Sequence, residues 1–141
     1  MRVLGIDLGR RRIGLAISDT SGTLARPLTT LTVNEGEAVE RLVAEIDRLS
    51  AEDDGLDAIV VGVPLRLDGQ PNEGTVFAAS VLEALRQRTS LPVVGEDERL
   101  TSHEAESRLA LRERDWRKRK AKLDAAAAAV ILQDYLDRRH V

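Results

Sequence analysis

The chain has 141 residues, of which 43% are hydrophobic, and this is enough for one domain with a packed core. It contains no cysteine, which excludes disulfides and thiolate metal sites. It shows no signal-peptide pattern, and no apolar run approaches the ~20 residues that cross a membrane. We therefore expect a single domain over residues 1–141, in the cytoplasm and without membrane contact.

The net charge of −3 is unevenly distributed along the chain. The segment 112–122 carries seven basic and two acidic residues, whereas the rest of the chain sums to −8. This balance excludes a uniformly basic nucleic-acid coat but leaves room for a local basic patch. Aromatic residues make up only 2% of the chain, so base stacking on aromatic side chains is disfavoured.

Three strand patterns open the chain, at Val3–Leu8, Ile13–Ile17 and, after Pro27, Leu28–Val33. The connections between them are short, which predicts antiparallel pairing. Apolar spacing then predicts a helix over 36–50.

The second half of the chain alternates strands with helices. A continuous apolar run at 58–63 is typical of a strand buried on both faces, and a helix is expected over about 73–88. A fifth strand begins at Pro92 and continues into the acidic residues that follow. The pattern therefore predicts an α/β fold, with a mixed five-stranded sheet of three antiparallel and then parallel strands, and helices on both faces.

Two further helices are expected at the C-terminal end. Thr101 and Glu104 form a capping-box pattern, which predicts a helix from Thr101 to about Arg112. The basic segment 112–122 is interpreted as a helix end followed by a mobile loop. The last helix is expected over about 122–138.

Asp7 is an acid within an apolar strand. Strand alternation places it on the opposite face from Leu4, Ile6 and Leu8. A carboxylate in such a strand is costly unless a cation meets it, and the following turn, Gly9–Arg12, supplies positive charge. An acid that suits a metal, next to bases that suit phosphate, indicates phosphodiester chemistry.

Further acids occur where the fifth strand ends and where the last helix begins. Glu96 and Glu98 share one face of the strand, and Asp97 lies on the other. This run can bind a ligand at the strand end, or it can be a solvated terminus. Asp124 can act through the helix dipole alone, but the five alanines that follow it would let the helix approach the sheet closely. Together with Asp7, these acids could bind Mg²⁺ or Mn²⁺.

Four blocks of the sequence carry a family resemblance, and they extend from near the first residue to near the last. They are Gly5–Gly9 with Arg12–Ala16 and Ser18–Asp19; Val61–Pro64 with Asp68–Gly69; Asp97–Ser102 with Ala105–Glu106; and Lys122–Ala128 with Ile131–Leu136. In this order they resemble the YqgF/RuvX family of pre-16S ribosomal RNA nucleases, which belongs to the ribonuclease H-like superfamily and is related to the RuvC Holliday-junction resolvases.

The resemblance implies a ribonuclease H-like fold and metal-dependent cleavage of structured RNA or branched DNA. It implies that Asp7, Glu98 and Asp124 are the catalytic, Mg²⁺- or Mn²⁺-binding carboxylates, with Asp97 and Arg99 beside them to position metal or phosphate. The choice between Asp97 and Glu98 as the metal ligand stays open. The fourth acid that is common in the superfamily is missing from Val61–Pro64, so the number of bound metal ions, one or two, stays open. The expected nucleic-acid contacts are Arg10, Arg11, Arg12, Arg99, Arg117, Lys118, Arg119, Lys120 and Lys122.

Maturation of the 5′ end of pre-16S rRNA is the leading functional hypothesis. Holliday-junction resolution is the alternative within nucleases, and it would require a symmetric dimer. A non-catalytic nucleic-acid-binding transcription factor is a third reading. Kinase-like ATPases share the opening strand, but they need two domains, which exceeds this length. We expect a monomer or a weak homodimer.

Overall fold

The computed structural model describes residues 1–34, 36–64, 70, 72–97 and 116–139, and within 116–123 only the helical backbone. The helix expected from Thr101 lies outside the described residues, as do Asp68, Glu98 and Arg99. Among the described residues, no helix combines the length and the apolar character that crossing a membrane would need.

A five-stranded sheet forms the centre of the molecule, in the order β3-β2-β1-β4-β5. β1 pairs antiparallel with β2, and β2 pairs antiparallel with β3. β1 pairs parallel with β4, and β4 pairs parallel with β5. The mixed sheet expected from the sequence is therefore confirmed. The strands are β1 (Val3–Leu8), β2 (Arg12–Ser18), β3 (Ala25–Thr32), β4 (Ala58–Val63) and β5 (Val93–Asp97).

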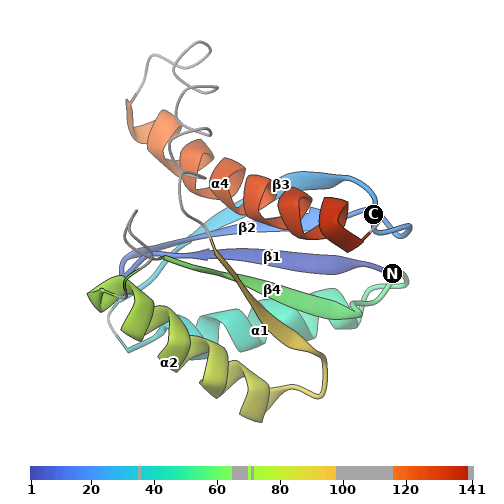
Figure 1. Ribbon diagram of the computed structural model, residues 1–141, viewed down its shortest axis with the longest axis horizontal. Coiled ribbons are helices and arrows are strands. Elements are labelled where there is room, and N and C mark those ends of the chain that lie inside the picture. The colour runs from blue at the N-terminus through green and yellow to red at the C-terminus, as the bar shows by residue number, and fades with distance from the viewer. Residues whose placement is uncertain (35, 65–69, 71, 98–115, 140–141) are drawn as a thin grey trace.

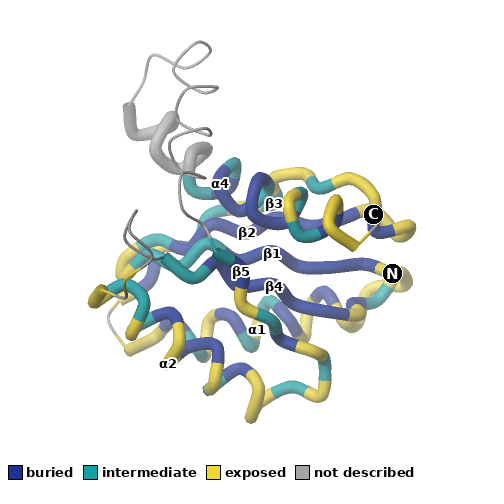
Figure 2. The backbone as a smooth tube through the Cα atoms, viewed as in Figure 1, coloured by how far each residue is buried: buried dark blue, intermediate teal, exposed yellow. Residues whose placement is uncertain are grey.

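Helices cover both faces of this sheet (Figure 1). α1 (Ala38–Ser50) and α2 (Glu73–Arg88) lie on one face, and α4 (Trp116–Arg139) crosses the other. Burial follows the same layers, because β1, β2 and β4 are mostly buried between the helices, whereas the outer sides of α1 and α2 are exposed (Figure 2). The edge strand β3 is mostly exposed or half-buried. β4 is buried on both faces, as its continuous apolar run indicated.

The alternation of β1 assigns its side chains to these two layers. Leu4 and Ile6 belong to the core under α1 and α2. Val3 belongs to the core under α4, together with Ile131 and Leu132 of that helix. Residues with odd numbers in β1 therefore face α4, and this places Asp7 on the α4 side of the sheet.

Two boundaries differ from the sequence-based prediction by about three residues or more, and the others by one or two. β3 begins at Ala25 rather than Leu28 and therefore includes Pro27, which is tolerated because β3 is an edge strand and the ladder shifts register there. α4 begins at Trp116, so the mobile loop expected up to Lys122 is wrong for residues 116–122. Arg, Lys and Ala are strong helix formers, and here they extend the last helix by about two turns.

Candidate active site on the α4 face of the sheet

Asp7 lies opposite Gly14 in the antiparallel pair of β1 and β2. It is half-buried on the face that α4 covers. Gly14 has no side chain, so the neighbouring position on β2 leaves the space beside the Asp7 carboxylate to whatever α4 brings there. The glycine at position 14 therefore leaves room for α4 beside Asp7.

α4 fills that space with the backbone of Asp124. A Cβ atom at Gly14 would lie 1.9 Å from the Asp124 carbonyl oxygen, and a Cβ atom at Gly5 would lie 2.8 Å from Leu132 Cβ. Both distances are shorter than any normal contact, so the helix can pack this closely only on glycine. Ala125, Ala127 and Ala128 are buried at the same contact. The close approach expected from the alanine run is therefore found, and it brings Asp124 to the strand that pairs with Asp7.

Arg12 joins the N-terminal turn to this helix. Its Nε lies 3.0 Å from Asp124 Oδ2, and the two side chains are 34% and 23% exposed. Arg12 also lies on the α4 face of β2, two residues before Gly14. The guanidinium therefore fixes the orientation of the Asp124 carboxylate. Arg12, which the sequence placed among the nucleic-acid contacts, lies in the candidate active site itself.

A second buried carboxylate, Glu96, lies on the same face of the sheet. Glu96 pairs with Gly62 on β4, and continuing the β1–β4 register by one residue places Gly62 beside Asp7. Asp7, Gly62 and Glu96 thus form one row across three strands. Glu96 is 8% exposed and forms an ion pair with Arg138, near the end of α4.

Burial raises the pKa of Glu96 above its ordinary value. The Arg138 guanidinium acts in the opposite direction, whereas the carboxylates of Asp134 and Asp97 raise the pKa further. Burial dominates because Glu96 is enclosed while the Arg138 side chain is 64% exposed and shares its charge with water. Sequence reasoning placed Glu96 and Asp97 on opposite faces of the strand but gave no signal for the contact between Glu96 and Arg138.

Asp97 lies on the opposite face from Asp7. It pairs with Val63, and a Cβ atom at Gly95, two residues earlier, would contact Val63 and Leu82 of α2. Alternation therefore turns Asp97 towards the α2 layer. Glu98 and Arg99, the other expected site residues from this strand end, lie outside the described residues.

The expected basic contacts separate into two groups. Arg10 and Arg11 are exposed in the turn between β1 and β2. Five basic residues occupy the first turns of α4, immediately ahead of Asp124, and they are Arg117, Lys118, Arg119, Lys120 and Lys122. The second group therefore continues from the candidate site along the same helix.

The donor chemistry of this site suits a hard divalent cation. Asp7 and Asp124 bring carboxylates from a strand and a helix to the same face, and carboxylate oxygen is the ligand type that Mg²⁺ and Mn²⁺ prefer. Within the described parts of the chain, no group of three His, Cys, Asp or Glu side chains is assembled.

Nearly the whole chain is similar to proteins that are named as nucleases. The family model described as "RuvX: Holliday junction resolvase" matches residues 1–138. A protein of Anaeromyxobacter dehalogenans named "Putative pre-16S rRNA nuclease" is 45% identical over 140 residues, covering 99% of this chain and 98% of that protein. A protein of Chloroflexus aggregans with the same name is 42% identical over 137 residues, covering 97% of this chain and 94% of that protein.

The fold is also similar to a solved resolvase structure. "T. thermophilus RuvC in complex with Holliday junction substrate" superposes with a TM-score of 0.57 at 22% identity, covering 99% of this chain and 96% of that chain. At this identity the likeness concerns the fold alone.

Proposed function

We propose that this chain, which belongs to the RuvX family, is a metal-dependent endonuclease that processes the 5′ end of pre-16S rRNA. Its relatives are named as nucleases, and the match extends over nearly their whole length, which supports a nuclease role for the chain. The observation that carries the proposal is that the Asp124 backbone lies against Gly14, the cross-strand partner of Asp7, on the α4 face of the sheet. Action on a ribosomal precursor would place the protein in the cytoplasm.

Each residue of the site has a distinct part in this reaction. Asp7 and Asp124 would hold Mg²⁺ or Mn²⁺, with Glu98 as the third carboxylate. Such an ion supplies an activated water and stabilises charge on the leaving oxygen. Arg12 orients Asp124 through its 3.0 Å contact. The basic residues at 117–122 and Arg99 would contact phosphates on either side of the cut.

Glu98 is preferred over Asp97 as the third carboxylate. Gly95 packs towards α2, whereas Glu96 contacts α4 through Arg138. If the alternation of β5 continues, residue 98 shares the face of Glu96 and Asp7, and Asp97 does not. Asp97 would then act on the structure of the strand end rather than on the metal.

Conservative substitutions test this assignment. Asp7→Asn, Glu98→Gln and Asp124→Asn should each lower the cleavage rate at least ~100-fold, because loss of a metal ligand removes several kcal/mol of transition-state stabilisation. Asp97→Asn is the matched control and should retain most of the activity. Thermal unfolding of each variant checks that the fold persists. Loss of activity in Asp97→Asn with full activity in Glu98→Gln would reverse the assignment.

Holliday-junction cleavage is the second candidate, favoured by the description of the family. A resolvase must cut two strands symmetrically, so this function would require a dimer with two facing sites. Symmetric nicks in a four-way DNA junction, with no cut in precursor rRNA, would favour it over the first proposal.

A further inference from the structure

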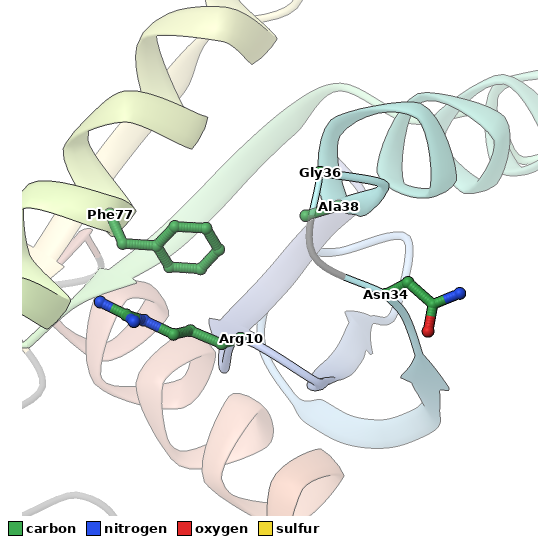
Figure 3. A pocket seen from close by; sticks show the side chains of 5 residues that line it. All are labelled: Arg10, Asn34, Gly36, Ala38 and Phe77. Carbon is green, nitrogen blue, oxygen red and sulfur yellow. The ribbon is translucent and has the colours of Figure 1, made fainter.

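The three consecutive arginines of the β1–β2 turn do not share one environment. Arg12 contacts Asp124 on the α4 side of the sheet. Arg10 and Arg11 line a hollow of about 440 Å³ together with Thr32, Val33 and Asn34 at the end of β3. Arg10 and Asn34 also line a second hollow of about 140 Å³, whose wall includes Phe77 of α2 (Figure 3). The turn therefore presents one arginine to the candidate active site and two to a separate concave surface.

The backbone that carries these two arginines is held by hydrogen bonds. Gly9 N donates to Arg12 O at 2.9 Å, which closes the turn. Val33 N donates to Arg11 O at 2.8 Å, which ties the turn to the end of β3. Arg10 and Arg11 are thus exposed side chains on a fixed support, and this lowers the entropy lost when they bind a ligand.

The charges of the two guanidinium groups are available to an anion. The contact between Arg10 and Glu73 is long, at 3.5 Å, and its side chains are 58% and 92% exposed, so it stabilises the fold very little. Arg11 forms no side-chain hydrogen bond or ion pair with any other described residue. A phosphate accepts paired hydrogen bonds from arginine and can displace such a weak contact.

The surroundings limit what kind of anion fits. Glu37 bonds to Asn34 at one border of the hollow, and Glu73 lies beside Arg10. These two carboxylates repel any phosphate that lies past Arg10 and Arg11 at the border of the hollow. The surface therefore suits one or two phosphates of a single strand better than the two phosphate backbones of a duplex. In Figure 3 the Arg10 side chain lies alongside the Phe77 ring, which gives the smaller hollow an apolar wall.

We infer that Arg10 and Arg11 form a subsite for a single-stranded segment of the nucleic-acid substrate, next to the bond that is cut. The inference rests on the proposed function, because the subsite is placed relative to the bond that the nuclease cuts. Arg11 and Arg12 are neighbours whose Cα atoms are ~3.8 Å apart, so the hollow lies close to the residue that contacts Asp124. A strand that leaves the site at Asp124 and passes the turn reaches the hollow within a few nucleotides. The enzyme would then prefer a cut site where paired nucleic acid meets an unpaired flank.

Binding measurements on an inactive protein test this subsite. Fluorescence anisotropy of Asp7→Asn protein is compared for an RNA duplex with a single-stranded flank and for the same duplex with blunt ends. Adding Arg10→Ala or Arg11→Ala should weaken binding of the flanked RNA about 3- to 10-fold and leave the blunt duplex unchanged, as expected for ~1 kcal/mol per lost phosphate contact. The salt slope for the flanked RNA should fall by ~0.7 per contact.

Arg26→Ala is the matched control, because it removes the same charge from an exposed residue at the start of β3. It should change neither affinity. Equal losses for flanked and blunt RNA, or no loss for either, would overturn the subsite. Binding of adenosine monophosphate alone, lost in Arg11→Ala while the flank preference persists, would make the ligand a free nucleotide and contradict the inference.

The outcome is separable from that of the proposed function. Asp7→Asn protein is used only for binding, so the flank preference does not depend on cleavage. A preference that requires Arg10 and Arg11, in a protein whose unsubstituted form cuts no nucleic acid, would reject the nuclease proposal and keep the subsite. Cleavage without any flank preference would keep the nuclease proposal and reject the subsite.

Discussion

At the level of single residues, Glu96 is the most buried of the carboxylates whose pKa is shifted. Its pKa is raised by burial and by the nearby carboxylates of Asp134 and Asp97, although Arg138 lies against it. The folded chain therefore binds the Glu96 proton more tightly than the unfolded chain does. The contribution of Glu96 to stability is full below pH 4.5, its ordinary pKa, and is lost as the pH rises through the raised value.

Glu96→Gln should remove this pH dependence. The free energy of unfolding of the unsubstituted protein, measured by urea titration, should fall relative to that of Glu96→Gln as the pH is raised from 4 to 7. Below this pH range, Asp19 provides a comparison of opposite sign, because hydrogen bonds from Ser21, Thr23 and Leu24 lower its pKa to about 2. Its contribution is present above pH 3.8 and is lost as the pH falls towards 2. A constant difference between the Glu96 proteins across the range would contradict the shift.

At the scale of elements, the contact between α4 and the sheet determines where Asp124 lies. The helix rests on Gly14 and Gly5, where its backbone and Leu132 occupy the space that a side chain would fill. Gly14→Ala places a methyl group against the Asp124 carbonyl, and neither backbone can yield. Gly5→Ala is the matched control, because it crowds the same helix near Leu132, about two turns from Asp124.

Both substitutions should lower the free energy of unfolding by ~1–3 kcal/mol, the usual cost of overpacking. Only Gly14→Ala should also lower the cleavage rate, by at least ~10-fold, since it displaces the carboxylate of Asp124, a proposed metal ligand, by a fraction of an ångström or more. The measurements are urea unfolding and initial rates at a temperature where both variants are folded. Equal rates in the two variants would show that the approach at Gly14 does not position the site.

Much of this arrangement could be predicted from local sequence patterns. The alternation of β1 gave the face of Asp7, and the alanines after Asp124 indicated a helix close to the sheet. The start of α4 could not be predicted, because a dense basic run is compatible with either a helix or a loop until its neighbours are known. The early start of β3 was missed because Pro27 normally ends a strand and is accepted here only at an edge with a register shift. The pairing of Glu96 with Arg138 depends on a contact between residues far apart in the sequence.

At the scale of the whole molecule, the acidic character of most of the chain concentrates nucleic-acid binding on few elements. The basic residues at 117–122 lie on α4 ahead of Asp124, so their phosphate contacts would lead directly into the site. Neutralising Arg117, Lys118 and Arg119 together should weaken substrate binding and lower the slope of log affinity against log salt by about one unit per lost contact. Arg26→Ala and Arg86→Ala, on other elements, should leave the slope unchanged. An unaltered slope in the triple variant would remove this segment from the interface.

The proposed function requires that Asp7 belongs to a metal-dependent site that cuts precursor rRNA. The most direct measurement is cleavage of a 5′-labelled pre-16S leader RNA during a Mg²⁺ titration, with a four-way DNA junction assayed in parallel, for the unsubstituted protein and Asp7→Asn. We predict a discrete cut in the RNA that requires Mg²⁺, is abolished by a chelator and is lost in Asp7→Asn protein that still binds the RNA. Cleavage that persists with the chelator or in Asp7→Asn, or cuts confined to the DNA junction, would contradict the proposed function.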